Sequence, residues 1–211
     1  MKKYMLPVAG CLILALALVG CSKDPLRDMT DEESRIYITN HDSTISFSTF
    51  KTFSISDSIS VISNNRLEGR ESTNLDLLYV GAVRKAMTDR GFHEVSRNAN
   101  PDLGINVSRI YNSSTGVVSY PDYWGGYYDY YDPFYWGYPG YGYSFPQSYG
   151  VYEITEGALS VDILDIKDAD DSKTINGVWN GLIRGSGVFV SGSAASNVEA
   201  LFAQSPYISS N

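Results

Sequence analysis

The stretch NLDLLYVGAVRKAMTDR, residues 74–90, has the clearest helical pattern in the chain. Together with the segments around it, this helix indicates the fold class. Its apolar residues recur every three or four positions, which predicts an amphipathic helix. Ser72, Thr73 or Asn74 can cap the start, and Gly91 follows where helices commonly end in a left-handed residue. The apolar positions are Leu75, Leu78, Tyr79, Ala82, Val83, Ala86 and Met87.

Segments on both sides of this helix alternate apolar and polar residues, which predicts half-buried strands. The expected strands cover residues 45–55, 102–110, 159–166 and 178–184, and a second helix covers residues 197–204. Residues 57–73 are polar and are expected to form a loop. This order predicts an α+β fold, a two-layer sandwich in which helices pack on one face of a mostly antiparallel sheet.

The first 21 residues have the pattern of an export signal. Lys2 and Lys3 precede an apolar run at residues 6–19, which is too short to span a bilayer but has the length of a signal-peptide core. The run ends in LVGC at residues 18–21, which resembles the lipobox of bacterial lipoproteins. The resemblance implies cleavage after Gly20 and acylation of Cys21, so that the membrane is a partner through the N-terminal lipid.

This assignment has consequences for charge and chemistry. Cys11 leaves with the signal peptide and Cys21 becomes acylated, so the mature chain has no free thiol and we expect no metal site or cofactor. It retains 14 Lys and Arg against 24 Asp and Glu, a net charge of −10. Nucleic acid is therefore not an expected partner, because phosphate binding needs clustered basic residues. Ser22, where Asp would signal inner-membrane retention, implies an outer-membrane protein facing the periplasm or the surface.

The chain divides into parts of different composition. We expect a lipoprotein signal peptide at residues 1–20 and the acylated Cys with a flexible tether at residues 21–44. A single α+β domain is expected at residues 45–211, with a Tyr/Gly-rich insert at residues 119–152.

The insert carries the most unusual chemistry in the sequence. Between Tyr120 and Tyr152, 16 of 33 residues are aromatic and none is Lys or Arg. Three interpretations remain open: a loop packed on the sheet edge, a surface for envelope glycan or another envelope protein, and a self-associating or membrane-interface segment. The candidate ligand contacts are Tyr123, Trp124, Tyr127, Tyr128, Tyr135 and Trp136.

No catalytic motif is found in the sequence. Ser48 and Lys51 have a Ser-x-x-Lys spacing but fall in an expected strand, where they would point to opposite faces. Residues 168–174 resemble a calcium loop but lack the required Gly and Glu, which favours an acidic turn. His41 has no evident partner, and His93, which follows Gly91 and Phe92, is expected to be a surface or packing residue. We therefore expect a non-enzymatic binding or structural module, with an envelope hydrolase as the alternative.

Several short motifs, taken in order, resemble the bacterial lipoproteins grouped as domain of unknown function 4136. The resemblance covers residues 45–207 and implies an α+β fold and an envelope location, with no catalytic residues to carry over. The motifs are FSTFKTF at 47–53, RGF at 90–92, PDL at 101–103, GALSVD at 157–162, VWNG at 178–181 and the C-terminal segment from Phe202 to Tyr207.

Overall fold

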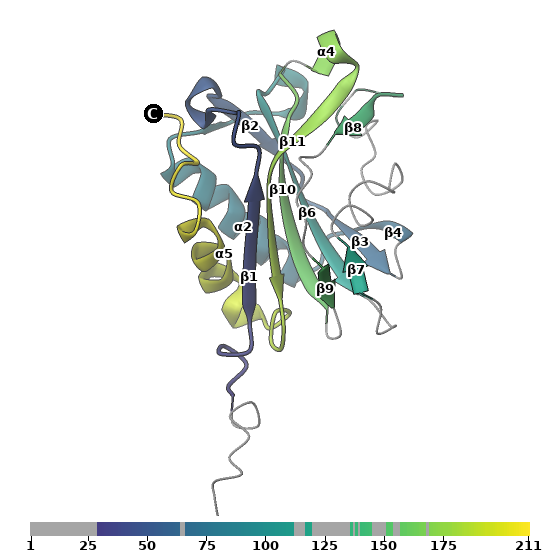
Figure 1. Ribbon diagram of the computed structural model, residues 1–211, viewed down its shortest axis with the longest axis vertical. Helices are drawn as coiled ribbons and strands as arrows, with labels where there is room; N and C mark the ends of the chain where they lie inside the picture. The colour runs from purple at the N-terminus through teal and green to yellow at the C-terminus, as the bar shows by residue number, and fades with distance from the viewer. Residues whose placement is uncertain are drawn as a thin grey trace, which may run out of the picture.

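The protein forms two layers in which helices cover one face of a large sheet. The computed structural model describes residues 29–63, 66–111, 117–119, 136, 138, 140–144, 151–153, 157–167 and 169–211. Helices α2 (Asn74–Asp89) and α5 (Ala194–Ala203) contact each other on the same side of the sheet (Figure 1). The expected α+β sandwich is therefore confirmed. In the described part of the chain, no helix is long and apolar enough to cross a bilayer.

The large sheet has an antiparallel centre and parallel additions at its edges. Strands β1, β11, β10 and β6 are successive antiparallel neighbours, whereas β2 and β3 both run parallel to β6 along its other edge. The strands described in this sheet are β1 (Ile36–His41), β2 (Thr52–Ile55), β3 (Ile59–Ser63), β4 (Arg66–Glu71), β5 (His93–Glu94), β6 (Leu103–Tyr111), β8 (Gly142–Ser144), β10 (Ala158–Asp165) and β11 (Thr174–Arg184). Strands β7 (Val117–Ser119) and β9 (Val151–Glu153) form a separate pair, and the short helices are η1 (Phe47–Thr49), η2 (Arg97–Ala99), α4 (Ala169–Ser172) and η3 (Ser191–Ser193).

Helix α2 forms where the sequence predicts it because both of its ends are encoded locally. Thr73 caps the start in a reciprocal capping box with Asp76, which satisfies backbone donors of the first turn. Gly91 follows the end with φ +88, a conformation that a side chain disfavours. The helix buries one face against the sheet, whereas Leu77 and Leu78 remain exposed.

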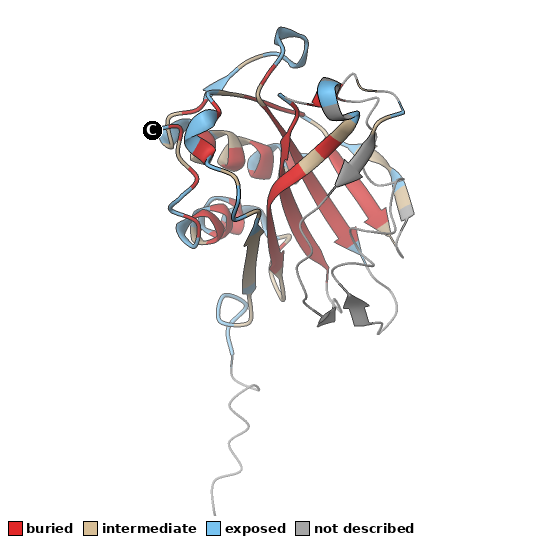
Figure 2. Ribbon diagram, turned by 45° about the horizontal axis from the view of Figure 1, so that its top comes forward, coloured by how far each residue is buried: buried red, intermediate tan, exposed pale blue. Residues whose placement is uncertain are grey.

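Both faces of the central strands are buried, which differs from the half-buried strands that the alternation predicts. Strand β10 is buried along its whole length, and β6 is buried except at Tyr111 (Figure 2). The face toward the helices carries apolar residues such as Ile105, Val161 and Ile163. The second face is therefore not a solvent-exposed surface, although many of its residues are polar.

A second hydrophobic cluster lies on that other face, at the end where β10 meets β11. Trp136 packs there with Leu164, Ile166, Ala169 and Ile175. Its indole lies so close to Gly104 that a Cβ on this glycine would be 3.1–3.2 Å from three ring atoms.

The prediction of a continuous strand at residues 45–55 is wrong in its first half. Residues Phe47–Thr49 form the 3-10 turn η1, and only Thr52–Ile55 is a strand. A 3-10 turn aligns side chains three positions apart, so Phe47 and Phe50 both enter the core, each 3% exposed.

The prediction of a loop at residues 57–73 is also wrong, because the segment contains the β3–β4 hairpin. Ile59, Val61 and Ile62 are buried in β3, beside β6. Most of the charged residues that suggested a loop belong to β4, which among the described strands pairs with β3 alone and is an edge strand. Charged residues are common on such edges because they disfavour pairing with another chain.

Residues 36–41, which the sequence analysis assigns to the tether, are part of the large sheet. Residues Ile36–His41 form β1, which pairs with β11 over its whole length. This segment begins with the β-branched and aromatic residues Ile-Tyr-Ile-Thr, a strand signal that follows closely on the polar residues 30–34. The other elements lie close to their predicted positions, although β11 begins at Thr174 and α5 at Ala194.

Candidate functional site

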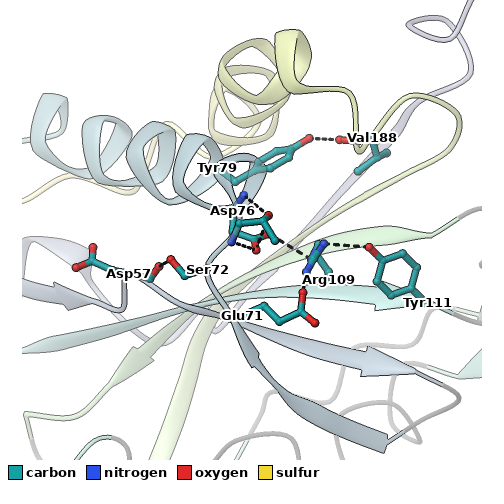
Figure 3. Close-up of polar contacts among 9 residues, drawn as sticks. Asp57, Glu71, Ser72, Asp76, Tyr79, Arg109, Tyr111 and Val188 are labelled. Carbon is teal, nitrogen blue, oxygen red and sulfur yellow. Dashed lines mark hydrogen bonds and ion pairs between the residues drawn. The ribbon is translucent and has the colours of Figure 1, made fainter.

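One buried ionic cluster joins the sheet to the start of α2. Arg109, on the helix-facing side of β6, is 9% exposed and pairs through Nε with Asp76 Oδ1 at 3.2 Å (Figure 3). The same guanidinium donates to the Glu71 carboxylate and to the Tyr111 hydroxyl, the latter at 3.3 Å. The other Asp76 oxygen accepts hydrogen bonds from the backbone and hydroxyl of Thr73, each at 2.8 Å. These contacts fix β4, β6 and α2 together.

A second polar cluster joins both helices to the N-terminal strand. The Tyr79 hydroxyl donates to the Val188 carbonyl and accepts from Asn197 Nδ2 at 2.8 Å. Asn197 Oδ1 accepts from Arg35 at 3.0 Å and from the Tyr37 hydroxyl at 2.9 Å. Burial raises the pKa of Tyr79, so its hydroxyl stays neutral and hydrogen-bonded. Like the Arg109 cluster, this network holds elements together.

A row of polar side chains crosses the second face of the sheet. Asn40, Asn180, Asp162 and Asn106 are cross-strand neighbours on β1, β11, β10 and β6. Asn180 donates through Nδ2 to Asp162 and, at 3.0 Å, to the Ser160 hydroxyl. Asp162 is fully buried and Asn180 is 5% exposed. The row places amide and carboxylate groups where an ordinary sheet core has aliphatic residues.

Two atoms of this row have no hydrogen-bond partner within the described part of the structure, Oδ1 of Asn180 and Nδ2 of Asn40. An unsatisfied buried polar group costs roughly 1–3 kcal/mol. One free acceptor and one free donor on adjacent strands can bind a water molecule or another polar group.

A charged surface pocket of about 480 Å³ lies between α2 and the β2–β5 edge. Arg84 crosses it and pairs with Asp57 and with Glu94, at 2.8 Å each. Partial burial lowers the pKa of Arg84, but the hydrogen bonds to Glu94 and Asp57 outweigh it and raise the value overall. Arg84 therefore stays positively charged, and the Asp57 and Glu94 carboxylates balance that charge.

A second surface pocket of about 390 Å³ lies at the end of β1. His41, Phe47 and Tyr207 contribute aromatic rings, and serine hydroxyls complete much of the lining. The His41 and Tyr207 ring centroids are 4.2 Å apart. The sequence leaves His41 without a partner, because its partner is 166 positions away in the chain.

The residues that the sequence singles out are mostly outside the described part of the chain. These are Gly20 and Cys21 at the lipobox, and Tyr123, Trp124, Tyr127, Tyr128 and Tyr135 in the insert. Trp136 is described and is 6% exposed, so its indole packs inside the protein. Tyr138 and Tyr141 stack nearby at 5.2 Å, and Tyr138 donates to the Ile166 carbonyl. Among the residues that the structure describes, no group of three or more His, Cys, Asp or Glu is placed to hold a metal ion.

Sequence reasoning missed the polar row and the His41–Tyr207 pair. Three members of the row, Asn106, Asp162 and Asn180, lie in segments that the sequence predicts as strands, among the polar positions. From the sequence alone, these polar positions indicate a solvent-exposed face, because the burial of that face cannot be known from alternation. Nothing in the local sequence indicates the His41–Tyr207 contact, because it depends on how the C-terminal segment packs beside β1.

The fold and these clusters define a class, a two-layer α+β domain with a polar second sheet face and shallow surface pockets. The chain belongs to the family of proteins with domain of unknown function 4136 (DUF4136), whose family model matches residues 38–207. This confirms the resemblance seen in the sequence.

Solved structures with this fold include a DUF4136 family protein from Bacteroides thetaiotaomicron, 25% identical, with a TM-score of 0.69 over 84% of this chain and 99% of that one. A PDZ domain protein from Parabacteroides distasonis is 17% identical, with a TM-score of 0.45 over 82% of this chain and 36% of that one. A PelC dodecamer from Paraburkholderia phytofirmans is 9% identical, with a TM-score of 0.41 over 84% of this chain and 99% of that one. No curated protein matches the chain.

Proposed function

We propose that this protein is a lipid-anchored component of the bacterial cell envelope, with a non-enzymatic binding or structural role at the outer membrane. The observation that carries the proposal is the sequence LVGC at residues 18–21, which ends a short apolar run with two lysines before it. In this proposal Cys21 becomes the first residue of the mature protein and carries the lipid.

The start of the described structure supports an anchor close to the domain. Met29 is the first described residue, eight positions after Cys21, and eight residues span at most about 28 Å. Arg35 then donates to the Ser186 carbonyl at 3.4 Å, and β1 begins at Ile36. An acyl group on Cys21 would therefore keep the N-terminal end of the domain near the bilayer.

The lipid has to supply most of the membrane affinity. The mature chain has a net charge of −10, which gives no electrostatic attraction to anionic lipid. Each buried CH₂ contributes about 0.8 kcal/mol, and a single myristoyl chain gives only reversible binding. The diacylglyceryl and N-acyl chains of a processed lipoprotein are enough for stable anchoring.

Metabolic labelling with an alkyne fatty acid tests the anchor. Wild-type protein is expected to incorporate the label and to sediment with membranes, whereas Cys21→Ala does neither. Cys11→Ala is the matched control, because it removes the only other thiol in the chain and should behave as wild type. Label on Cys21→Ala, or unlabelled wild-type protein, would overturn the proposal.

A further inference from the structure

The pocket at the end of β1 is built by two segments that are far apart in the chain, residues 41–48 and residues 207–211. His41 ends β1, Phe47 belongs to η1, and Tyr207 lies in the C-terminal segment. That segment is held in place by buried contacts, because the Ser205 hydroxyl accepts from Trp179 Nε1 at 2.9 Å and bonds the Tyr207 hydroxyl at 3.0 Å. These contacts place Tyr207 at the pocket.

The lining of this pocket combines an aromatic face with hydroxyl groups. Tyr207 is 38% exposed and stands beside His41 and Phe47, with the Phe47 ring centroid at 6.0 Å. Ser46 and Ser48 present hydroxyls 2.9 Å apart, and each hydroxyl can both donate and accept. Such a surface can stack against a ring while bonding its polar substituents.

The charge of the lining distinguishes this pocket from the other one. None of the residues described as lining it is Asp, Glu, Lys or Arg, whereas Asp57, Arg84, Glu94 and Arg97 line the pocket beside α2. An ionic ligand would therefore find no carboxylate, ammonium or guanidinium side chain among these residues. The lining suits a neutral ligand that is rich in hydroxyl or amide groups.

The position of the pocket suits an envelope ligand. Strand β1 runs from Ile36, next to the tether, to His41 at the pocket, and the C-terminus lies at that same upper end in Figure 1. Six residues of strand advance about 17 Å. With an anchor at Cys21, the pocket would lie at the end of the domain that faces away from the bilayer.

We propose that this pocket binds a neutral sugar ring of an envelope glycan, with Tyr207 as the stacking platform and Ser46 and Ser48 as hydrogen-bonding groups. The biological setting rests on the proposed envelope location, but the binding itself does not. Sugar binding by the purified protein is measured without any lipid, so this inference and the anchor can fail independently.

The test titrates the purified mature chain with two uncharged tetrasaccharides, tetra-N-acetylchitotetraose and cellotetraose, followed by NMR chemical-shift changes. The first represents N-acetylhexosamine glycans and the second plain glucans. Binding of at least one is expected, with a loss of affinity of at least tenfold in Tyr207→Ala and less than threefold in Tyr207→Phe, which keeps the ring.

Leu78→Ala is the matched control, because Leu78 is 48% exposed on α2 and is not among the residues that line the pocket. It should bind the sugar as wild type does. Ser48→Phe provides a second test if Tyr207→Ala does not fold, because Ser48 is exposed and a phenyl group there would fill the pocket.

Failure of both sugars to bind at millimolar concentration would refute the proposal. Equal losses in Tyr207→Ala and Leu78→Ala, or binding of a stem tripeptide in place of the sugars, would do the same.

Discussion

At the level of single residues, Gly104 on β6 illustrates how the second face of the sheet is built. The Trp136 indole lies directly over its backbone, and a Cβ would meet three indole atoms at 3.1–3.2 Å. Trp136 is enclosed by Leu164, Ile166 and Ile175, so it has little freedom to move away. The glycine is required here for close approach, since its φ is not in the left-handed region.

Gly104→Ala is therefore expected to destabilise the protein by about 1–2 kcal/mol through overpacking. Urea denaturation followed by circular dichroism measures the change in the free energy of unfolding. The control is Gly81→Ala in α2, where a Cβ meets nothing within 4 Å and the change should stabilise by about 0.5–1 kcal/mol. If the two variants have equal stability, Trp136 is not packed on Gly104.

At the level of elements, some could be predicted from the local sequence, whereas others form only by pairing with distant segments of the chain. Helix α2 was predictable almost to the residue because its cap, its apolar face and its terminal glycine all lie within one short stretch. The β3–β4 hairpin was not, because Ile59 and Val61 become strand residues by pairing beside β6, more than 40 positions away. Strand β1 likewise depends on β11 at the other end of the chain.

The capping of α2 leads to a prediction that shows which of three residues is its N-cap. The sequence left Ser72, Thr73 and Asn74 open, and the structure assigns the cap to Thr73 through its bond from the Asp76 backbone. Thr73→Ala should lower the free energy of unfolding by about 1 kcal/mol. Ser72→Ala and Asn74→Ala should each change it by less than 0.5 kcal/mol in the same denaturation assay. A larger loss in either of those two would assign the cap differently.

At the level of the whole molecule, the two ends of the sheet have different roles in our proposals. The end at Ile36 receives the tether, and the end at His41 and Tyr207 carries the uncharged pocket. The aromatic insert remains a further candidate contact, but Trp136 is part of the folded structure and should be left intact in any test.

The insert is best tested by replacing its other candidate contacts with serine and keeping Trp136. We expect the variant to lose photo-crosslinking to an envelope protein partner, while its thermal unfolding midpoint stays unchanged. Trp136→Ser should instead lower that midpoint. If the serine variant keeps the crosslink, the insert is not the surface that contacts this partner. The replaced residues are Tyr123, Trp124, Tyr127, Tyr128 and Tyr135.

The sequence by itself determined the α+β class, the position of α2, the central strands and the family. These follow from periodicity, capping residues and short motifs, all of which are local properties of the chain. Only the tertiary structure decided that the polar face of β6, β10 and β11 is buried, that residues 36–41 join the sheet, and that His41 meets Tyr207. Burial and long-range pairing depend on which segments meet in space, and the alternation of side chains along a strand cannot tell a covered polar face from a solvated one.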